Sequence, residues 1–361
     1  MCSSDLDPNG GFYSTLDADS EGVEGKFYVW QLDEFRNAAG ADADELARYF
    51  DVSAHGNWEH QNILNVPRHT EDPALLEKIA SLRSRLFEIR KQRIHPGRDE
   101  KILTDWNGLM LRAFAEAAAF LNHPGYRKVA EENAEFLLST LWDGKRLLHS
   151  YKDGRARFNG YLDDYVNVAD GLLALYQLTF DRRWLDKSIE LADLIHARFA
   201  DPVQGGFFFT ATDHEQLISR TKDQFDNATP SGNSVAADLL LRLSALMNRT
   251  DYRHTAEKIL ESAANLAVQF PAGFGRLLAA MDFHVGPRKE IAIIGGPEPL
   301  LTELRKHYLP RVVVAAGNTD AHPLLENRPA IQGQPTAYVC QDFVCLAPVT
   351  DVKQFREQLL S

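Results

Sequence analysis

The chain has 361 residues, of which 44% are apolar and 25% charged, and its formal net charge at pH 7 is −12. This is the composition of an ordinary globular protein that is long enough for a large buried core. The acidic balance argues against nucleic acid and anionic membranes as partners, because phosphate binding relies on clustered Lys and Arg. No run approaches the roughly 18 apolar residues of a membrane helix, and no signal-peptide pattern opens the chain. We therefore expect a cytoplasmic or organelle-matrix protein.

The first hundred residues predict loops, short strands and a few helices. Residues 1–30 combine glycine turns with short aromatic runs, and two short helices are expected near 31–39 and 42–50. A longer amphipathic helix is expected from about 72 to 93. Pro73 suits its first turn, and Pro96-Gly97 closes it.

A repeated pattern of helical hairpins follows. Three polar clusters each open a helix, and about twenty residues later an aromatic residue opens a second helix. The clusters are Asp105-Trp106-Asn107, Asp163-Asp164-Tyr165 and Ser231-Gly232-Asn233, and the aromatics are Tyr126, Trp184 and Tyr252. A repeat of this size indicates stacked hairpins, which we predict over about 104–141, 163–199 and 231–269. A ring of such hairpins would gather its polar openers at one end, where a pocket would lie.

A glycine motif indicates that the ring is incomplete in this sequence. Gly205-Gly206-Phe207, a few residues after the second hairpin, echoes Gly10-Gly11-Phe12. By the same logic a hairpin should precede Gly10, yet only nine residues stand before it. We therefore expect a helical toroid that is truncated at its N-terminus.

The last part of the chain predicts a small α/β segment. After Pro287, β-branched runs at 290–294 and 312–315 flank a helical stretch, and two further strands are expected near 336–339 and 343–346. We expect the partial toroid to cover 1–286 and the α/β segment to cover 287–361. Cys340 and Cys345 are separated by four residues, which fits neither a redox Cys-x-x-Cys nor a zinc knuckle, so ordinary buried thiols are expected.

The candidate catalytic groups are the carboxylates in the polar clusters that begin the hairpins. Adjacent aspartates at a helix start, as at Asp163-Asp164, can serve only as a cap and a first-turn anion. In the functional interpretation, one caps the helix while the other faces the pocket as general acid or base. Glycoside chemistry needs two carboxyl groups on opposite sides of a bond, and Asp105, at the equivalent place in the preceding hairpin, is the expected partner.

Other polar and aromatic residues near the openers are candidate ligand contacts. Trp106 and Tyr165 could stack on a sugar ring, and His149 could act as a base, although a core tryptophan and a structural histidine are the alternatives. The remaining candidates could line the opposite wall or serve as caps and loop charges: Asn107, Lys222, Asp223, Asp226, Ser231 and Asn233. We expect no metal site and no cofactor.

Several motifs together resemble a known family over almost the whole chain. They include "GNWEHQNIL", "DEKILTDWNGLM", "LDDY", "RTKDQFDNATPSGNSVAA" and "PTAYVCQDFVC". In these motifs the chain resembles the C-terminal part of the thioredoxin-domain-containing proteins related to spermatogenesis-associated protein 20. The resemblance implies a mainly helical (α/α) toroid similar to six-hairpin glycosidases and N-acylglucosamine 2-epimerases. It also implies that the family's thioredoxin-like domain and first hairpins are missing from this sequence.

Two functions are therefore expected from the sequence. The first is a carbohydrate-active or carbohydrate-binding domain of unknown substrate, which could be a hydrolase using paired carboxylates. An epimerase is less favoured, because toroid epimerases depend on paired pocket histidines and only His149 lies near the expected mouth. The second is a non-catalytic scaffold for the missing thioredoxin-like domain, in which backbone N–H groups would wholly engage Asp163 and Asp164.

Overall fold

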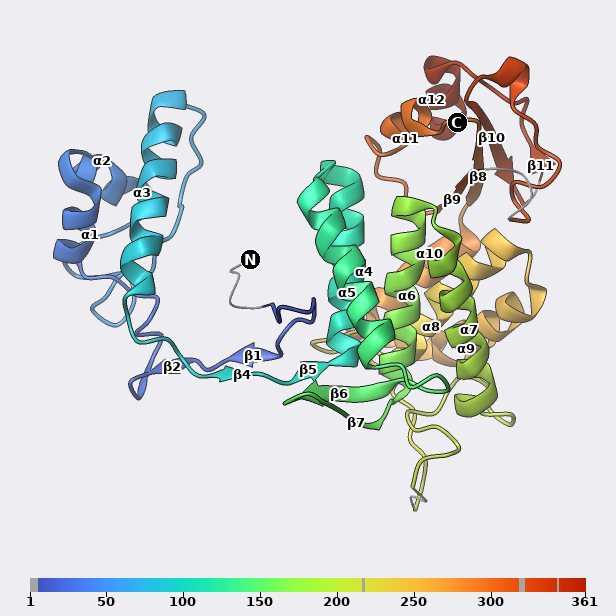
Figure 1. Ribbon diagram of the computed structural model, residues 1–361, viewed down its shortest axis with the longest axis horizontal. Helices are drawn as coiled ribbons and strands as arrows, with labels where there is room; N and C mark the ends of the chain where they lie inside the picture. The colour runs from blue at the N-terminus through green and yellow to red at the C-terminus, as the bar shows by residue number, and fades with distance from the viewer. Residues whose placement is uncertain (1–5, 216–217, 318–321, 343) are drawn as a thin grey trace. The chain divides into compact units, whose positions relative to one another are not determined.

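The computed structural model describes residues 6–215, 218–317, 322–342 and 344–361 (Figure 1). Its contacts divide the chain into two compact units, one of Ser14–Glu100 and one of Met1–Tyr13 with Lys101–Ser361. The boundary that we expected at 286/287 is a different division and stays a prediction. None of the helices in the described ranges has the length and apolarity needed to cross a membrane.

The unit of residues 14–100 has its own apolar core. Its helices are α1 (Leu32–Ala39), α2 (Ala43–Tyr49) and α3 (Pro73–Lys91), and its short strands are β1 (Thr15–Leu16), β2 (Asp19–Ser20), β3 (Val23–Glu24) and β4 (Arg98–Asp99). The side chain of Asp72 accepts the Ala74 N–H and caps α3, with Pro73 in the first turn. The helices pack around fully buried Phe35 and Leu46.

The second unit is built on three helical hairpins, as the repeat predicts. They are α4 (Thr104–Leu121) with α5 (Pro124–Thr140), α6 (Leu162–Thr179) with α7 (Arg182–Phe199), and α8 (Gly232–Met247) with α9 (Thr250–Gln269). In each hairpin the first helix ends in a left-handed residue, namely Asn122, Phe180 or Asn248, which ends the helix and lets the chain reverse. A seventh helix, α10 (Gly275–Val285), follows a short 3₁₀ turn and packs on α8.

Two glycines bring the backbones of α4 and α6 close together. A Cβ placed on Gly108 would lie 2.5 Å from the Asn167 carbonyl carbon, and one on Gly171 would lie 2.8 Å from the Gly108 oxygen. Only glycine leaves room for this approach. Along α6 and α8 nearly every residue is buried, so these helices form the centre of the unit.

A three-stranded antiparallel sheet lies at the N-terminal end of α4 (Figure 1). It consists of β5 (Ile102–Leu103), β6 (Leu148–Lys152) and β7 (Arg155–Asn159) in the order β5-β6-β7. Since β5 runs directly into α4 and β7 precedes α6 by two residues, the sheet holds the starts of both helices together.

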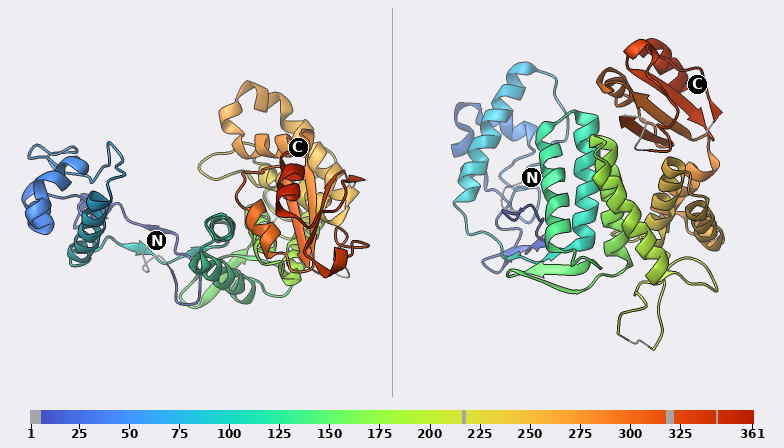
Figure 2. Two further views of the ribbon diagram at one scale, coloured as in Figure 1. Left: turned by 90° about the horizontal axis from the view of Figure 1, so that it is seen from above. Right: turned by 45° about the vertical axis from the view of Figure 1, so that its right-hand side comes forward.

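The predicted C-terminal α/β segment is present as a layer of its own (Figure 2). Its elements are β8 (Lys289–Ile294), α11 (Glu298–Leu304), β9 (Val312–Gly317), β10 (Thr336–Gln341), β11 (Val344–Cys345) and α12 (Val352–Leu360). The sheet order is β11-β10-β8-β9, with β8 and β9 parallel and the other pairs antiparallel. Ile291 and Ile293 pack with α11 and α12, while Ala292 and Ile294 join the core of the hairpins, because alternate side chains point to opposite faces.

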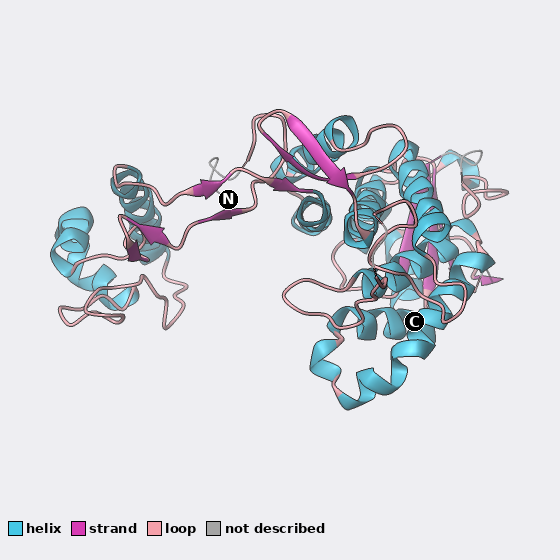
Figure 3. Cartoon of the chain, turned by 90° about the horizontal axis from the view of Figure 1, so that it is seen from below, coloured by secondary structure: helices cyan, strands magenta, loops and turns pink. Residues whose placement is uncertain are grey.

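The fold prediction is therefore confirmed in its mainly helical character, its three hairpins and its small sheet segment near the C-terminus (Figure 3). The expectation for the cysteines is wrong. Cys340 and Cys345 are opposite partners on β10 and β11, and their sulfurs form a disulfide. The reversal of the chain between the two strands brings them together, which sequence spacing alone did not reveal.

Candidate active site

The expected site lies where α4, α6 and α8 begin. Asp105 is in the first turn of α4, and Asp163 and Asp164 are in the first turn of α6. The start of α8 comes so close that a Cβ on Gly232 would collide with the Asp163 Oδ1 atom. The three predicted openers therefore meet at one end of the helices, and glycine at position 232 makes this approach sterically feasible.

Asp164 is fully buried, and both oxygens of its carboxylate form hydrogen bonds within the protein. Its Oδ1 atom accepts the Asp105 N–H at 3.0 Å, and its Oδ2 atom accepts the Tyr161 N–H at 2.8 Å. The Nδ1 atom of His149, on β6, lies 3.0 Å from Oδ2. Asp164 thus ties together α4, the start of α6 and β6, and leaves no side of its carboxylate for a ligand.

Burial raises the pKa of Asp164 to about 6, and the hydrogen bond to His149 opposes this rise. The pKa of His149 is raised chiefly by the hydrogen bond to Asp164, against the effect of its own partial burial. The hydrogen bond couples the ionisation of the two groups, so neither behaves as an isolated side chain in water.

Asp163 and Asp105 differ from Asp164 because each has an oxygen without a partner. Among the described residues, the Oδ1 atoms of both are buried yet form no hydrogen bond. Burial raises the pKa of Asp163 to about 7, with further contributions from the nearby charges of Asp105, Asp164 and Asp223. Burial also raises the pKa of Asp105. Carboxyl groups tuned in this way are frequent at functional sites.

Three side chains at this site are also potential metal ligands. In the ranges that the structure describes, Asp105, His149 and Asp164 place one donor atom each within 4.8 Å of one another. The sequence predicts no metal here. An ion would have to separate the His149 Nδ1 atom from the Asp164 carboxylate that it directly contacts, so the present geometry suits a hydrogen-bonded pair better.

The two expected aromatic platforms have different environments. Trp106 is 41% exposed, which leaves part of its indole accessible beside Asp105. Tyr165 is 2% exposed, its hydroxyl accepts the Leu147 N–H, and its ring packs near Phe199. This corrects the stacking role expected for Tyr165, because a helix turns about 100° per residue and carries this side chain into the core.

The two asparagines among the openers hold the glycine motifs. Asn107 accepts the Phe12 N–H at 2.8 Å and donates to the Phe12 carbonyl, and Asn233 makes the same pair of bonds with Phe207. Both side chains are buried. The similarity between the Gly10 and Gly205 motifs thus has a structural cause, and ligand binding by the two asparagines stays a prediction.

The remaining candidates mostly stabilise loops and helix starts. Lys222 pairs with Asp201 and donates to the Gly205 carbonyl, and Ser231 caps α8. Asp226 accepts the Ser231 N–H and the Arg276 N–H, which joins the starts of α8 and α10. Asp223 alone among these acts on the site, through its charge on Asp163.

An aromatic group beside His149 was not predicted from the sequence. The Tyr161 ring packs edge-on against His149 with centroids 5.1 Å apart, and it stacks on Phe209 at 4.8 Å. A second histidine, His214, lies edge-on to Tyr161 at 5.3 Å. Tyr161 directly precedes the motif "LDDY", but the contact with residues 209 and 214 depends on a loop that the sequence does not position.

Several solved structures similar to this chain are carbohydrate-active enzymes. They include a cellobiose 2-epimerase from Spirochaeta thermophila (17% identity, TM-score 0.39, 45% of this chain and 43% of that chain). An α-1,6-mannanase from Salegentibacter sp. has 17% identity and a TM-score of 0.38 over 72% of this chain and 65% of that chain.

Curated relatives cover nearly all of the chain. Spermatogenesis-associated protein 20 of Homo sapiens is 28% identical over 409 residues, which cover 97% of this chain and 52% of the human protein. An uncharacterized protein of Caenorhabditis elegans is 26% identical over 403 residues, with 97% and 54% covered. No protein-family model matches. The resemblance to proteins related to spermatogenesis-associated protein 20 is confirmed, and this chain spans about half the length of those relatives.

Proposed function

We propose that Asp105 and Asp163 form an acid–base pair that acts on a carbohydrate. The observation that supports this most directly is the pair of buried Oδ1 atoms, for which the described part of the chain offers no hydrogen-bond partner. A buried carboxyl oxygen without a partner is costly, and a sugar hydroxyl or glycosidic oxygen would supply the missing bond. The neighbouring Asp164, in contrast, has all its bonds from within the protein.

The roles follow from the pKa values. Asp163, with a pKa of about 7, keeps its proton in a large fraction of molecules near neutrality and suits a general acid. Asp105 would act as the base or bind hydroxyl groups. Asp164 is a positioning residue that fixes His149 and the start of α4. The exposed part of Trp106 and the ring of Tyr161 would pack against the sugar.

The first experiment is a set of thermal melts against hexoses, amino sugars, uronic acids and disaccharides. A ligand present at a hundred times its dissociation constant stabilises the folded state by about 2.7 kcal/mol, which is readily detected. We expect a selective shift from one sugar class. Assays for released reducing ends and for epimerised product, followed by NMR, then identify the reaction.

The decisive variant is Asp163→Asn, with Asp33→Asn on the exposed surface of α1 as the matched control. We expect Asp163→Asn to retain sugar binding and to lose turnover by at least a hundredfold, because removing a general acid typically costs 10²–10⁴-fold. The control should behave as the unaltered protein. Full turnover in Asp163→Asn would contradict the assignment.

One observation favours the alternative function, a non-catalytic scaffold. The carboxylate of Asp164 is held entirely by backbone N–H groups and His149, as expected for a purely structural cap. In that case no sugar changes the melting temperature, and Asp105→Ala and Trp106→Ala leave every measured binding property unaltered. A sugar-dependent shift that Trp106→Ala weakens would exclude this alternative.

A further inference from the structure

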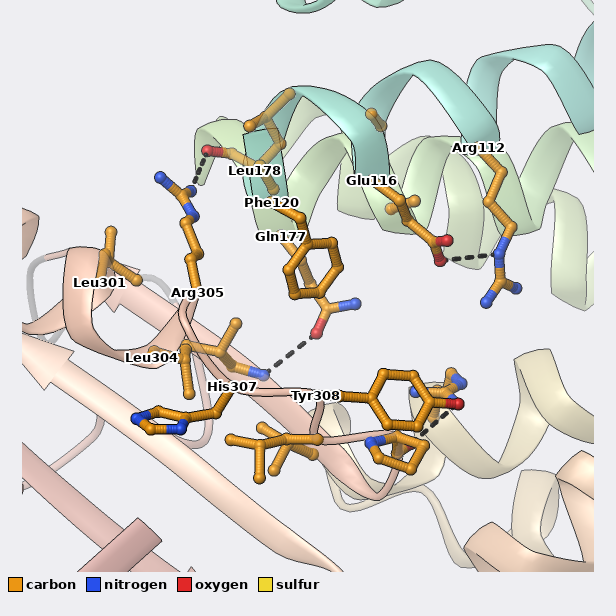
Figure 4. Close-up of a pocket in the computed structure, with 18 of the residues that line it drawn as sticks. Arg112, Glu116, Phe120, Gln177, Leu178, Leu301, Leu304, Arg305, His307 and Tyr308 are labelled. Carbon is orange, nitrogen blue, oxygen red and sulfur yellow. Dashed lines mark hydrogen bonds and ion pairs between the residues drawn. The ribbon is translucent and has the colours of Figure 1, made fainter. Parts of the chain in front are cut away.

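A cavity lies away from the aspartates, where the hairpins meet the C-terminal α/β segment. It has a volume of about 320 Å³ and is lined by α4, α6, α8 and α10 on one side and by α11 and β9 on the other (Figure 4). On α4, its lining runs from Arg112 to Phe120. These residues are seven to fifteen positions beyond Asp105, so roughly 10–22 Å of helix separates the two places. The cavity is within the size range of small-molecule sites.

The floor of the cavity is a network of arginines around two buried carboxylates. Arg276 contacts Asp170 at 2.8 Å and Asp238 at 2.7 Å, Arg112 contacts Asp170 at 2.5 Å, and Arg242 contacts Asp238 at 2.8 Å. Asp170 and Asp238 are almost fully buried. Three guanidinium groups therefore share two buried carboxylates.

Counted together with Glu116, three carboxylates balance these three guanidinium groups, so the excess positive charge on the lining comes from Arg305. Glu116 pairs with Arg112 at 2.9 Å, but its own side chain is about half exposed. A fourth arginine on the lining, Arg305, uses one nitrogen to donate to the Leu178 carbonyl at 3.0 Å. Within the described residues, the buried Nε atom of Arg276 has no hydrogen-bond partner. An anionic group that enters the cavity would bind the guanidinium groups on its lining.

The rest of the lining is apolar. Ala115, Ala119 and Phe120 contribute from α4, and Leu301 and Leu304 contribute from α11. Figure 4 shows Phe120 and Gln177 extending from the helices toward the α11–β9 side, where the Gln177 Oε1 atom accepts the Val314 N–H at 3.1 Å. That bond holds the edge strand β9 against α6, so the apolar wall is fixed in place.

We propose that this cavity binds a small amphipathic anion. Its phosphate or carboxylate group would contact Arg276 and Arg112, and its apolar body would lie against Phe120 and Leu304. A purely structural ion network would need neither an excess of arginine nor an apolar cavity beside it. The chain as a whole carries a net charge of −12, so a cationic floor at this place is a local feature rather than a general one.

The test uses four probes on the full chain in isothermal titration calorimetry. Octyl phosphate and octanoate carry both the charge and the apolar body, whereas inorganic phosphate and octanol each carry only one of them. We expect saturable binding of octyl phosphate, octanoate or both, at least tenfold tighter than either single-feature probe. The order of the first two distinguishes a phosphate from a carboxylate ligand. Equal binding of octanol, or no saturable heat with any probe, would overturn the proposal.

Matched substitutions on α4 locate the binding. Ala119→Phe fills the cavity without removing any charge, and Ala113→Phe places the same ring on an exposed position of the same helix. We expect Ala119→Phe to weaken binding of the preferred probe at least tenfold and Ala113→Phe to leave it unaltered. Arg276→Lys keeps the charge but removes the Nε donor, and it should weaken binding as well. Unaltered binding in Ala119→Phe would show that the ligand lies elsewhere.

Discussion

At the start of α6, two adjacent aspartates differ because their surroundings differ. Successive helix residues point about 100° apart, so Asp164 faces α4 and β6 while Asp163 faces the start of α8. Asp164 receives hydrogen bonds from both neighbours, and Asp163 has a buried oxygen that receives none from the residues that the structure describes. The chemistry proposed for the site therefore belongs to Asp163 together with Asp105.

The pKa of Asp163 predicts how stability depends on pH. The pKa of Asp163 in the folded protein is about 7, above the ordinary value of 3.8. The contribution of its protonated form to folding stability is therefore fully present below about pH 4 and is lost as the pH rises through 7. The asparagine side chain of Asp163→Asn cannot ionise, so this variant does not lose stability between pH 4 and pH 8 through position 163. On going from pH 4 to pH 8, the free energy of unfolding of the variant should therefore rise by roughly 2–4 kcal/mol relative to that of the unaltered protein. Urea unfolding at both pH values measures this, and a difference independent of pH would contradict it.

The hydrogen bond between His149 and Asp164 predicts that the pKa of His149 depends on Asp164. The Asp164 carboxylate raises the pKa of His149, so Asp164→Asn should lower it, because partial burial then dominates. NMR titration of the imidazole C–H signals measures the change, with the exposed His254 as an internal reference. The same histidine pKa in both proteins would show that the contact is not made in solution.

At the scale of elements, the same local structures recur at the two ends of the hairpins. Left-handed residues end the first helix of each hairpin, and an asparagine near the start of α4 and of α8 holds a Gly-Gly-Phe segment. Between these ends, Gly108 and Gly171 set the spacing of α4 and α6. The position of Asp105 relative to Asp164 depends on that spacing.

Substituting one of these glycines tests the close approach. A Cβ at Gly108 meets backbone atoms of Asn167 and Val168 at 2.5–2.6 Å, so Gly108→Ala should destabilise the fold by about 1–3 kcal/mol. A Cβ at Gly275, at the start of α10, would have no atom within 4 Å among the described residues, and Gly275→Ala should change stability by less than about 0.5 kcal/mol. Equal effects in chemical denaturation would contradict the close packing.

At the scale of the whole molecule, the chain contains two compact units with separate cores. Residues 14–100 surround Phe35, and the remaining residues surround a core that includes Phe199. The chain enters and leaves the smaller unit at adjacent places in the fold, since β1 and β4 pair near its two ends. Each unit therefore has the means to unfold by itself.

Differential scanning calorimetry tests this separation. We expect two transitions, and we expect Phe35→Ala and Phe199→Ala each to lower only one of them, because removing a buried phenylalanine side chain costs about 3–5 kcal/mol locally. Both residues are fully buried, so the two variants are matched. A single transition that both variants shift equally would show that the units unfold together.

The amino-acid sequence by itself determined the three hairpins, their boundaries within a few residues and the C-terminal α/β segment. These features depend on local signals, namely apolar periodicity, caps and turn residues. The sequence also pointed to Asp105, Asp163 and Asp164 as a group.

Only the tertiary structure decided how these residues differ. The partners of Asp164 come from β6 and α4, 15 and 59 residues away in the chain, and no local pattern records such distances. The same is true of the Tyr161–Phe209 stack, of the Cys340–Cys345 disulfide and of the arginine-lined cavity. Burial and long-range contact set the chemistry of a side chain, and both arise only when the helices pack.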